Sequence, residues 1–137
     1  MKPDLVDANV FIRLITKDDV KKAKRCFKLF EMARKNKASL STSESVLSEV
    51  VYILSSKKLY NLDRKKVKTL LEPLINLRGL KIEFKAEFLL ALRIFAEQNI
   101  DFEDALSAAY VKTKKFGKIY SYDKDFDKIK GVLRVEP

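Results

Sequence analysis

Short apolar runs alternate with longer amphipathic stretches along the chain, and this alternation limits the folds open to it more than any other feature. The apolar runs have the length of β-strands and lie at residues 5–6, 38–40, 80–84, 118–122 and 132–135. The stretches between them repeat apolar residues at helical spacing, at 10–15, 18–35, 43–55, 63–77, 86–98 and 101–115, with a further helical turn at 125–129. This order predicts an α/β fold with a short, mostly parallel central sheet of four or five strands, covered by helices.

Length and composition predict one folded domain, 1–137. The chain has 137 residues, of which 47% are hydrophobic, and only 3 Gly and 3 Pro. Its first residues, MKPDLVDANVF, include two aspartates and no long apolar run, so they match neither a signal peptide nor a membrane span. We therefore expect a cytoplasmic protein that makes no contact with a membrane.

The sequence contains no histidine and one cysteine, Cys26. The commonest general base and all imidazole ligands are thereby excluded, and neither a structural zinc site nor a Cys–His nucleophile pair fits. Cys26 forms no internal disulfide and lies in a helical pattern, where a packing role is the ordinary interpretation. Any catalysis has to use carboxylates, hydroxyls, lysines or a bound metal.

Positive charge is in excess, with 29 Lys+Arg against 19 Asp+Glu and a formal net charge of +10. Such an excess favours a polyanionic partner such as nucleic acid. Lysine-rich surfaces also occur as solvated ion-pair networks in thermophilic proteins, and the presence of a single glutamine, Gln98, agrees with that alternative. Charge by itself leaves nucleic-acid binding open.

Two acids, Asp7 and Asp123, stand where predicted strands end, which is where parallel sheets place their ligand sites. Each is followed two residues later by another polar residue, Asn9 after Asp7 and Asp125 after Asp123. The alternative is that these residues only form turns or cap the next helix. The same arrangement at two strand ends favours a site.

Glu49 lies on the predicted helix 43–55 at the edge of its apolar arc, so its carboxylate is expected at the rim of the core. Glu44 falls near the opposite rim of the same arc, so the helical angle alone does not separate the two glutamates. An ordinary half-buried boundary glutamate is the alternative for Glu49.

Asp101 and Asp104 are three residues apart at the start of the helix 101–115, which puts both at one end and near one face. In the alternative interpretation, Asp101 is the N-cap and Asp104 an acidic first-turn residue that only stabilises the helix dipole. The small residues that follow would let this helix approach the sheet closely and hold Asp104 against the strand ends; they are Ala105, Ala108 and Ala109.

Four acids in one pocket would repel one another, and a divalent cation supplies the compensation. Without histidine or a cysteine set, hard oxygen ligands select Mg²⁺ or Mn²⁺. Such an ion orients and deprotonates a water and offsets charge on the leaving oxygen of a phosphodiester. A basic surface around the acidic centre would then guide the phosphate backbone.

Taken in order, four segments resemble the PIN-domain family, and in particular the small bacterial and archaeal toxins called VapC. They are Leu5–Val10 (LVDANV), Ser48–Val50 (SEV), Asp104–Ala109 (DALSAA) and Ser121–Phe126 (SYDKDF). The resemblance covers essentially the whole chain. It implies the PIN-like three-layer α/β fold, in which helices lie on both faces of the sheet.

In that family the acids that match Asp7, Glu49, Asp104 and Asp123 bind one or two Mg²⁺ or Mn²⁺ ions and support endonucleolytic cutting of RNA. The resemblance therefore implies a catalytic and metal-binding role for these four residues. It also implies a homodimer and an antitoxin partner, a VapB-like protein whose tail lies over the active site.

Four further residues are expected to support the site. The resemblance implies that Asn9 and the hydroxyl of Ser121 help to organise the pocket, although the family pattern usually has Thr where this chain has Ser121. Asp101 and Asp125 lie near the site by position, and each has the alternative role of capping a helix or turn.

Two other functions compete with the nuclease interpretation. An aspartyl-phosphate phosphotransferase also places an acid at the end of its first strand, but it requires a second aspartate two residues later, where this chain has Asn9. A non-catalytic or RNA-processing PIN-domain RNA-binding protein would share the fold, and the four intact acids argue against a decayed site.

Overall fold

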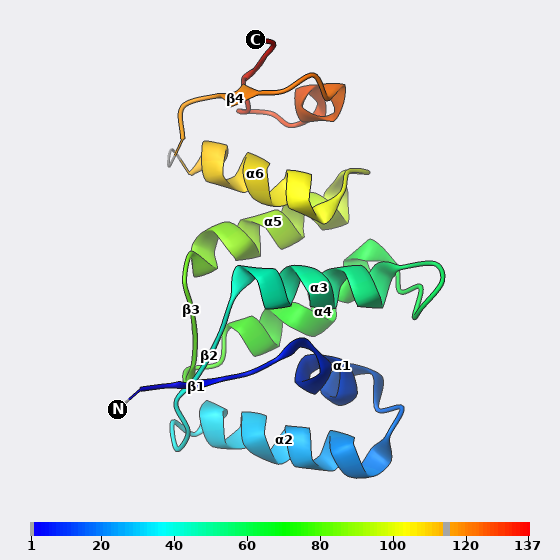
Figure 1. Ribbon diagram of the computed structural model, residues 1–137, viewed down its shortest axis with the longest axis vertical. Coiled ribbons are helices and arrows are strands. Elements are labelled where there is room, and N and C mark those ends of the chain that lie inside the picture. Colours follow the sequence, from blue (N-terminus) through cyan, green and yellow to red (C-terminus); the bar gives the residue numbers. More distant parts are fainter. Residues whose placement is uncertain (1, 114–115) are drawn as a thin grey trace. The chain divides into compact units, whose positions relative to one another are not determined.

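The computed structural model describes residues 2–113 and 116–137 (Figure 1). Packing divides the chain into a first unit that ends at Glu83 and a second unit from Phe84 to Pro137. Each unit contains its own small parallel sheet and its own helices.

The first unit contains a three-stranded parallel sheet in which β2 lies between β1 and β3. Its strands are β1 (Asp4–Leu5), β2 (Leu40–Thr42) and β3 (Leu80–Ile82). Its helices are α1 (Ala8–Thr16), α2 (Val20–Arg34), α3 (Glu44–Ser55) and α4 (Arg64–Ile75). Two helices separate each strand from the next, because a chain that forms parallel neighbours has to cross back before each new strand.

Side-chain caps fix the beginning of three of these helices. At the start of α2 the Asp19 side chain accepts a hydrogen bond from the Lys22 N–H. Ser43 accepts one from the Val46 N–H at the start of α3, and Asp63 accepts one from the Lys66 N–H at the start of α4. Each cap satisfies one of the N–H groups that the first helical turn leaves without a partner. The sequence offers Ser41, Thr42 and Ser43 as candidate N-caps for α3 and Asp63 for α4; the structure identifies Ser43 as the cap of α3 and confirms Asp63.

Apolar side chains from the helices and the central strand form the core of the first unit. The largest of them are completely or almost completely buried: Phe11, Leu40, Leu47, Leu54, Leu71 and Ile75. Gly79 lets β3 come close to the end of α2, since a Cβ at this position would lie 2.5 Å from the carbonyl oxygens of Ala33 and Ala38. Any larger residue at 79 would push these backbones apart.

The second unit contains two packed helices followed by a two-stranded parallel sheet. Its elements are α5 (Lys85–Glu97), α6 (Phe102–Lys112), β4 (Ile119–Tyr120), the 3-10 helix η1 (Lys124–Lys128) and β5 (Arg134–Val135). The ring of Phe102 lies 5.0 Å from that of Phe88 and 5.7 Å from that of Phe95, centroid to centroid. These contacts fix the first turn of α6 against α5.

The structure confirms an α/β fold with short parallel strands close to the predicted positions. In the described part of the chain the strands form a sheet of three and a sheet of two, so that one central sheet of four or five strands stays a prediction. Apolar runs locate strands, but the pairing of strands depends on hydrogen bonds between distant residues, which local patterns do not specify. Helix α6 ends at Lys112; the predicted helical residues 114–115 lie outside the described part of the chain.

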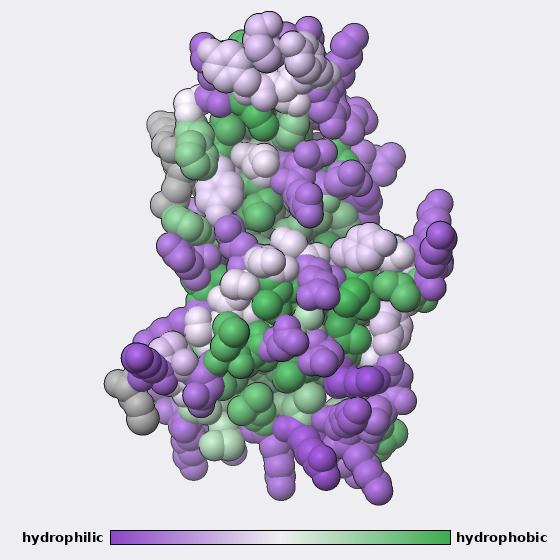
Figure 2. All heavy atoms as spheres, viewed as in Figure 1, coloured by the Kyte–Doolittle hydropathy of each residue, from purple (hydrophilic) through white to green (hydrophobic). Residues whose placement is uncertain are grey.

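Lysine side chains cover much of the outer surface of α2 and the turn that follows it. The exposed lysines are Lys21, Lys22, Lys24, Lys28, Lys35 and Lys37. Figure 2 shows hydrophilic residues over most of the visible part of this helix. The first unit thus has a strongly basic surface.

Among the described residues, no helix combines the length and apolar character that crossing a bilayer requires.

Candidate metal centre

The first turn of α6 presents Asp104. Asp101 occupies the N-cap position of this helix, but its side chain makes no capping hydrogen bond. The simple capping role that the sequence left open for Asp101 is therefore absent. Asp104 follows three residues later and is half-buried, whereas Asp101 and Glu103 are exposed. Three negative charges in one helical turn suit the helix dipole and also concentrate negative potential at Asp104.

The predicted small face of α6 is present, since Ala105, Ala108 and Ala109 are completely buried. Within the second unit the helix packs most extensively on α5. The predicted approach of α6 to the sheet stays a prediction. Small residues allow close approach to any neighbour, so their presence could not identify which element that neighbour would be. The packing places the backbone of Asp104, because Asp104 lies in the same helical turn as Phe102, whose ring packs on Phe88.

A loop that follows β4 presents the other two acids of the cluster. The Ser121 hydroxyl oxygen accepts a hydrogen bond from the Asp123 N–H at 3.0 Å. A carboxylate oxygen of Asp123 in turn accepts one from the Asp125 N–H at 2.9 Å. Phe126 is buried and anchors η1 at the end of the loop. Asp123 thus caps η1, as the alternative interpretation suggested, but a carboxylate has about four acceptor positions and keeps the others available.

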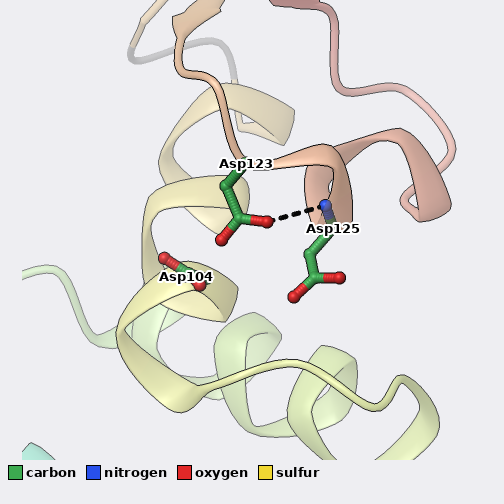
Figure 3. A group of neighbouring side chains, drawn as sticks. All are labelled: Asp104, Asp123 and Asp125. Carbon is green, nitrogen blue, oxygen red and sulfur yellow. Dashed lines mark hydrogen bonds between the residues drawn. The ribbon is translucent and has the colours of Figure 1, made fainter.

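Asp104, Asp123 and Asp125 come together from these two elements. A carboxylate oxygen of each lies within 4.8 Å of those of the other two. Figure 3 shows the three side chains pointing toward a common space, with the hydrogen bond from the Asp125 N–H to Asp123 closing the loop. Asp123 is exposed, and the other two are half-buried. The cluster is therefore open to a ligand from solvent.

Burial raises the pKa of Asp104 above its usual value, and the nearby negative charges of Asp123, Asp101 and Asp125 raise it further. Partial compensation comes from Lys128, whose ammonium group lies 3.0 Å from a carboxylate oxygen of Asp125. This pair is substantially exposed to water, so its contribution is small. The cluster holds more negative charge than its neighbours neutralise, and a bound cation would relieve the excess.

The remaining predicted residues, Asp7, Asn9 and Glu49, belong to the first unit. Asp7 follows β1 at the N-cap position of α1, is exposed and makes no capping hydrogen bond with its side chain. Asn9 is exposed in the first turn of α1. Glu49 is exposed on α3, whereas Glu44 is half-buried. Helices α1 and α3 pack against each other within this unit. That Asp7 and Glu49 share one site with Asp104 and Asp123 stays a prediction.

Two supporting contacts were not foreseen from the sequence. The buried hydroxyl of Thr42, at the end of β2, donates a hydrogen bond to the Val6 carbonyl at 3.0 Å and so fixes the backbone immediately before Asp7. The guanidinium of Arg134 on β5 donates a hydrogen bond to the Ser121 carbonyl at 2.9 Å. The first contact joins residues 36 apart in the sequence and the second joins residues 13 apart, so no helix or strand periodicity could have indicated them.

A protein-family model described as PIN domain matches residues 5–132. None of the curated proteins matches the sequence significantly. The matched range covers most of both units and every residue of the candidate centre.

Proposed function

Because the chain belongs to the PIN domain family, we propose that it is a metal-dependent endoribonuclease, which hydrolyses RNA phosphodiester bonds. PIN domains are generally nucleases, and the observation that carries the proposal is the convergence of Asp104, Asp123 and Asp125 within 4.8 Å. Acids that approach so closely in a family of nucleases are suited to hold a cation beside a phosphate.

The donor groups fit a hard divalent cation. All three groups are carboxylates, and the chain has no histidine to favour a softer metal. We propose Mg²⁺ or Mn²⁺, bound by Asp7, Glu49, Asp104 and Asp123. Asp125, whose carboxylate lies within 4.8 Å of those of Asp104 and Asp123, would be a further ligand. When bound, such an ion would activate a water and offset charge on the leaving oxygen. Asp123 is the exposed member of the described cluster and is the acid most accessible to an incoming phosphate.

The other residues would organise this centre. The hydroxyl of Ser121 orients the Asp123 backbone by the hydrogen bond described above. Asp101 adds negative charge beside Asp104 without capping its helix. Asn9 offers a neutral amide two residues after Asp7 and would contribute hydrogen bonds to water or phosphate.

We propose further that this nuclease is the toxin of a VapBC-type pair, a cytoplasmic homodimer held inactive by a VapB-like antitoxin. The support is the order of the four motif segments in a chain of 137 residues. The same proposal includes a single domain, 1–137, with one central sheet of four or five strands between helices. A short neighbouring gene that encodes a DNA-binding antitoxin is expected; a neighbourhood of RNA-processing genes would favour the processing role.

A non-catalytic or RNA-processing PIN-domain protein is the alternative. Metal-dependent cleavage of RNA separates a nuclease from a non-catalytic binder, and the neighbouring genes separate a toxin from an RNA-processing enzyme. The aspartyl-phosphate phosphotransferase is disfavoured, because Asn9 stands where that mechanism requires a proton-transferring aspartate.

The test compares two aspartates of the same loop region. Asp123→Asn is expected to lower Mn²⁺-dependent cleavage of single-stranded RNA at least about 100-fold, since it removes a ligand charge without changing side-chain volume. Asp127→Asn is expected to lose less than about tenfold, because Asp127 faces Arg134, at 3.0 Å, and is not in the cluster. Equal losses in a gel-based cleavage assay would show that the wrong aspartate has been assigned to the metal.

Binding of RNA is expected to weaken steeply with added salt. Lysines that contact phosphates release counterions, with a slope of about −0.7 per phosphate contact for a single strand. The exposed lysines of α2 are the candidates for such contacts. The affinity of Asp123→Asn for RNA, measured between low and moderate salt, checks this expectation. A flat response would mean that the net charge of +10 has no part in RNA binding.

A further inference from the structure

The guanidinium group of Arg134 connects three parts of the second unit. Its Nε and Nη2 donate hydrogen bonds to the two carboxylate oxygens of Asp127, at 3.0 and 3.2 Å. Its Nη1 donates to the backbone carbonyl of Ser121 at 2.9 Å and to Glu136 at 3.0 Å. The Arg134 side chain is only 12% exposed, whereas its partners Asp127 and Glu136 are exposed to solvent, and the contact with the Ser121 carbonyl is part-buried.

These contacts lie at both ends of the segment 121–127, which carries two acids of the cluster. At one end Arg134 binds the carbonyl of Ser121, the residue whose hydroxyl accepts the Asp123 N–H. At the other end it binds Asp127, two residues after Asp125. One planar group therefore sets the separation of the two ends, and the acids lie between them.

The chemistry of this contact requires arginine. A guanidinium donates in two directions from one rigid plane, whereas an ammonium group is a point charge on a flexible stem. The carboxylates of Asp127 and Glu136 raise the pKa of Arg134 further above its usual value, so the group stays charged.

We propose that Arg134 is a positioning residue of the candidate metal centre, which holds the segment 121–127 so that Asp123 and Asp125 face Asp104. This proposal rests on the proposed function, because it assumes that the aspartate cluster binds the metal. Arg134 itself touches neither metal nor substrate and acts only through the loop.

The experiment uses Arg134→Lys, which keeps the positive charge but removes the planar guanidinium group that donates hydrogen bonds to both ends of the segment. In Mn²⁺ titrations the Kd is expected to rise about 10- to 100-fold, as is usual when a residue that orients metal ligands is replaced. In the metal-free protein the amide hydrogen of Asp125, which is bonded to Asp123, is expected to exchange faster, while the amides of α5 and α6 keep their rates.

A matched control exists in the first unit. Arg34 forms the same kind of two-pronged pair with Glu31, at 2.7 and 3.0 Å, on the surface of α2. Arg34→Lys is expected to leave both the Mn²⁺ affinity and the Asp125 exchange rate unchanged. If Arg134→Lys does not fold, Asp127→Ala replaces it; unlike Asp127→Asn, whose amide oxygen still accepts a hydrogen bond from Arg134, this variant removes that anchor completely, and a rise of about tenfold in Kd is expected.

The outcomes separate the two proposals. Wild type that binds Mn²⁺, together with a folded Arg134→Lys of equal affinity and unchanged exchange, overturns the positioning role and leaves the nuclease proposal intact. Wild type that binds no Mn²⁺ overturns the metal centre, and the exchange rates then still decide whether Arg134 holds the loop. Faster exchange throughout α5 and α6 in Arg134→Lys would reveal a purely structural role and also count against the proposal.

Discussion

Asp7→Asn and Asp104→Asn are each expected to lower Mn²⁺-dependent RNA cleavage at least about 100-fold. Each change removes a charge from the proposed metal centre, and a bound metal stabilises the transition state by several kcal/mol, with about 1.4 kcal/mol for every factor of ten. The two residues lie in different units of the chain. Single-turnover cleavage of a labelled RNA, together with circular dichroism of each variant, measures the effect.

The controls are neighbouring acids. Asp4→Asn, three residues before Asp7, and Glu103→Gln, next to Asp104, are exposed and are expected to keep activity within about threefold of wild type. The double variant Asp7→Asn/Asp104→Asn should lose little more than either single variant, because residues that act on one ion are not additive. Fully additive losses would indicate two independent sites, and full activity of Asp7→Asn would restrict the site to the second unit.

Metal is expected to stabilise the wild-type protein strongly and the Asp104→Asn variant much less. Binding to the folded state contributes RT ln(1 + [L]/Kd), about 2.7 kcal/mol at a hundred times Kd. Without metal, Asp104→Asn is expected to have a higher melting temperature than wild type, since the substitution removes one negative charge from a crowded cluster. Loss of an acid from the first turn of α6 opposes this gain by about 0.3–1 kcal/mol.

The higher melting temperature expected for metal-free Asp104→Asn depends on pH. Because the pKa of Asp104 is raised in the folded protein, its ionised form costs stability at neutral pH. This cost disappears as the pH falls through the raised pKa and the carboxyl becomes neutral. The difference in melting temperature between variant and wild type should therefore shrink on acidification. Thermal melts in EDTA and in excess Mn²⁺ at several pH values test both claims; equal metal shifts in the two proteins would contradict a shared cation site.

Much of the secondary structure could be predicted, because it depends on neighbours in the sequence. The caps at Ser43 and Asp63 and the apolar period of the helices are local signals, and the structure has these elements close to the predicted positions. The strands were found in the same way. Their division into two sheets was not foreseen, since it rests on pairings such as Leu40 with Leu80.

In the candidate centre, too, contacts between distant residues could not be predicted from local patterns. The approach of Asp104 to Asp123 agrees with the placement of acids at a helix start and a strand end. From the sequence, Asp125 was predicted to be only a supporting residue, because its position also suited a capping role. In the structure its carboxylate belongs to the cluster. Glu49 was expected at the rim of the core and is exposed, because a helical angle gives a direction but not the neighbours that meet it. Arg134 had no local signal, since its partner Ser121 lies thirteen residues away.

The hydrogen bonds that shape the loop after β4 join residues only two apart, Ser121 with Asp123 and Asp123 with Asp125. Closing such short rings costs little chain entropy, and the Arg134 contacts close loops of only seven and thirteen residues. The arrangement of two of the three clustered acids is therefore encoded within one short stretch near the end of the chain. During folding, the contacts within this stretch are therefore expected to cost less chain entropy than the contact that brings Asp104 of α6 to Asp123.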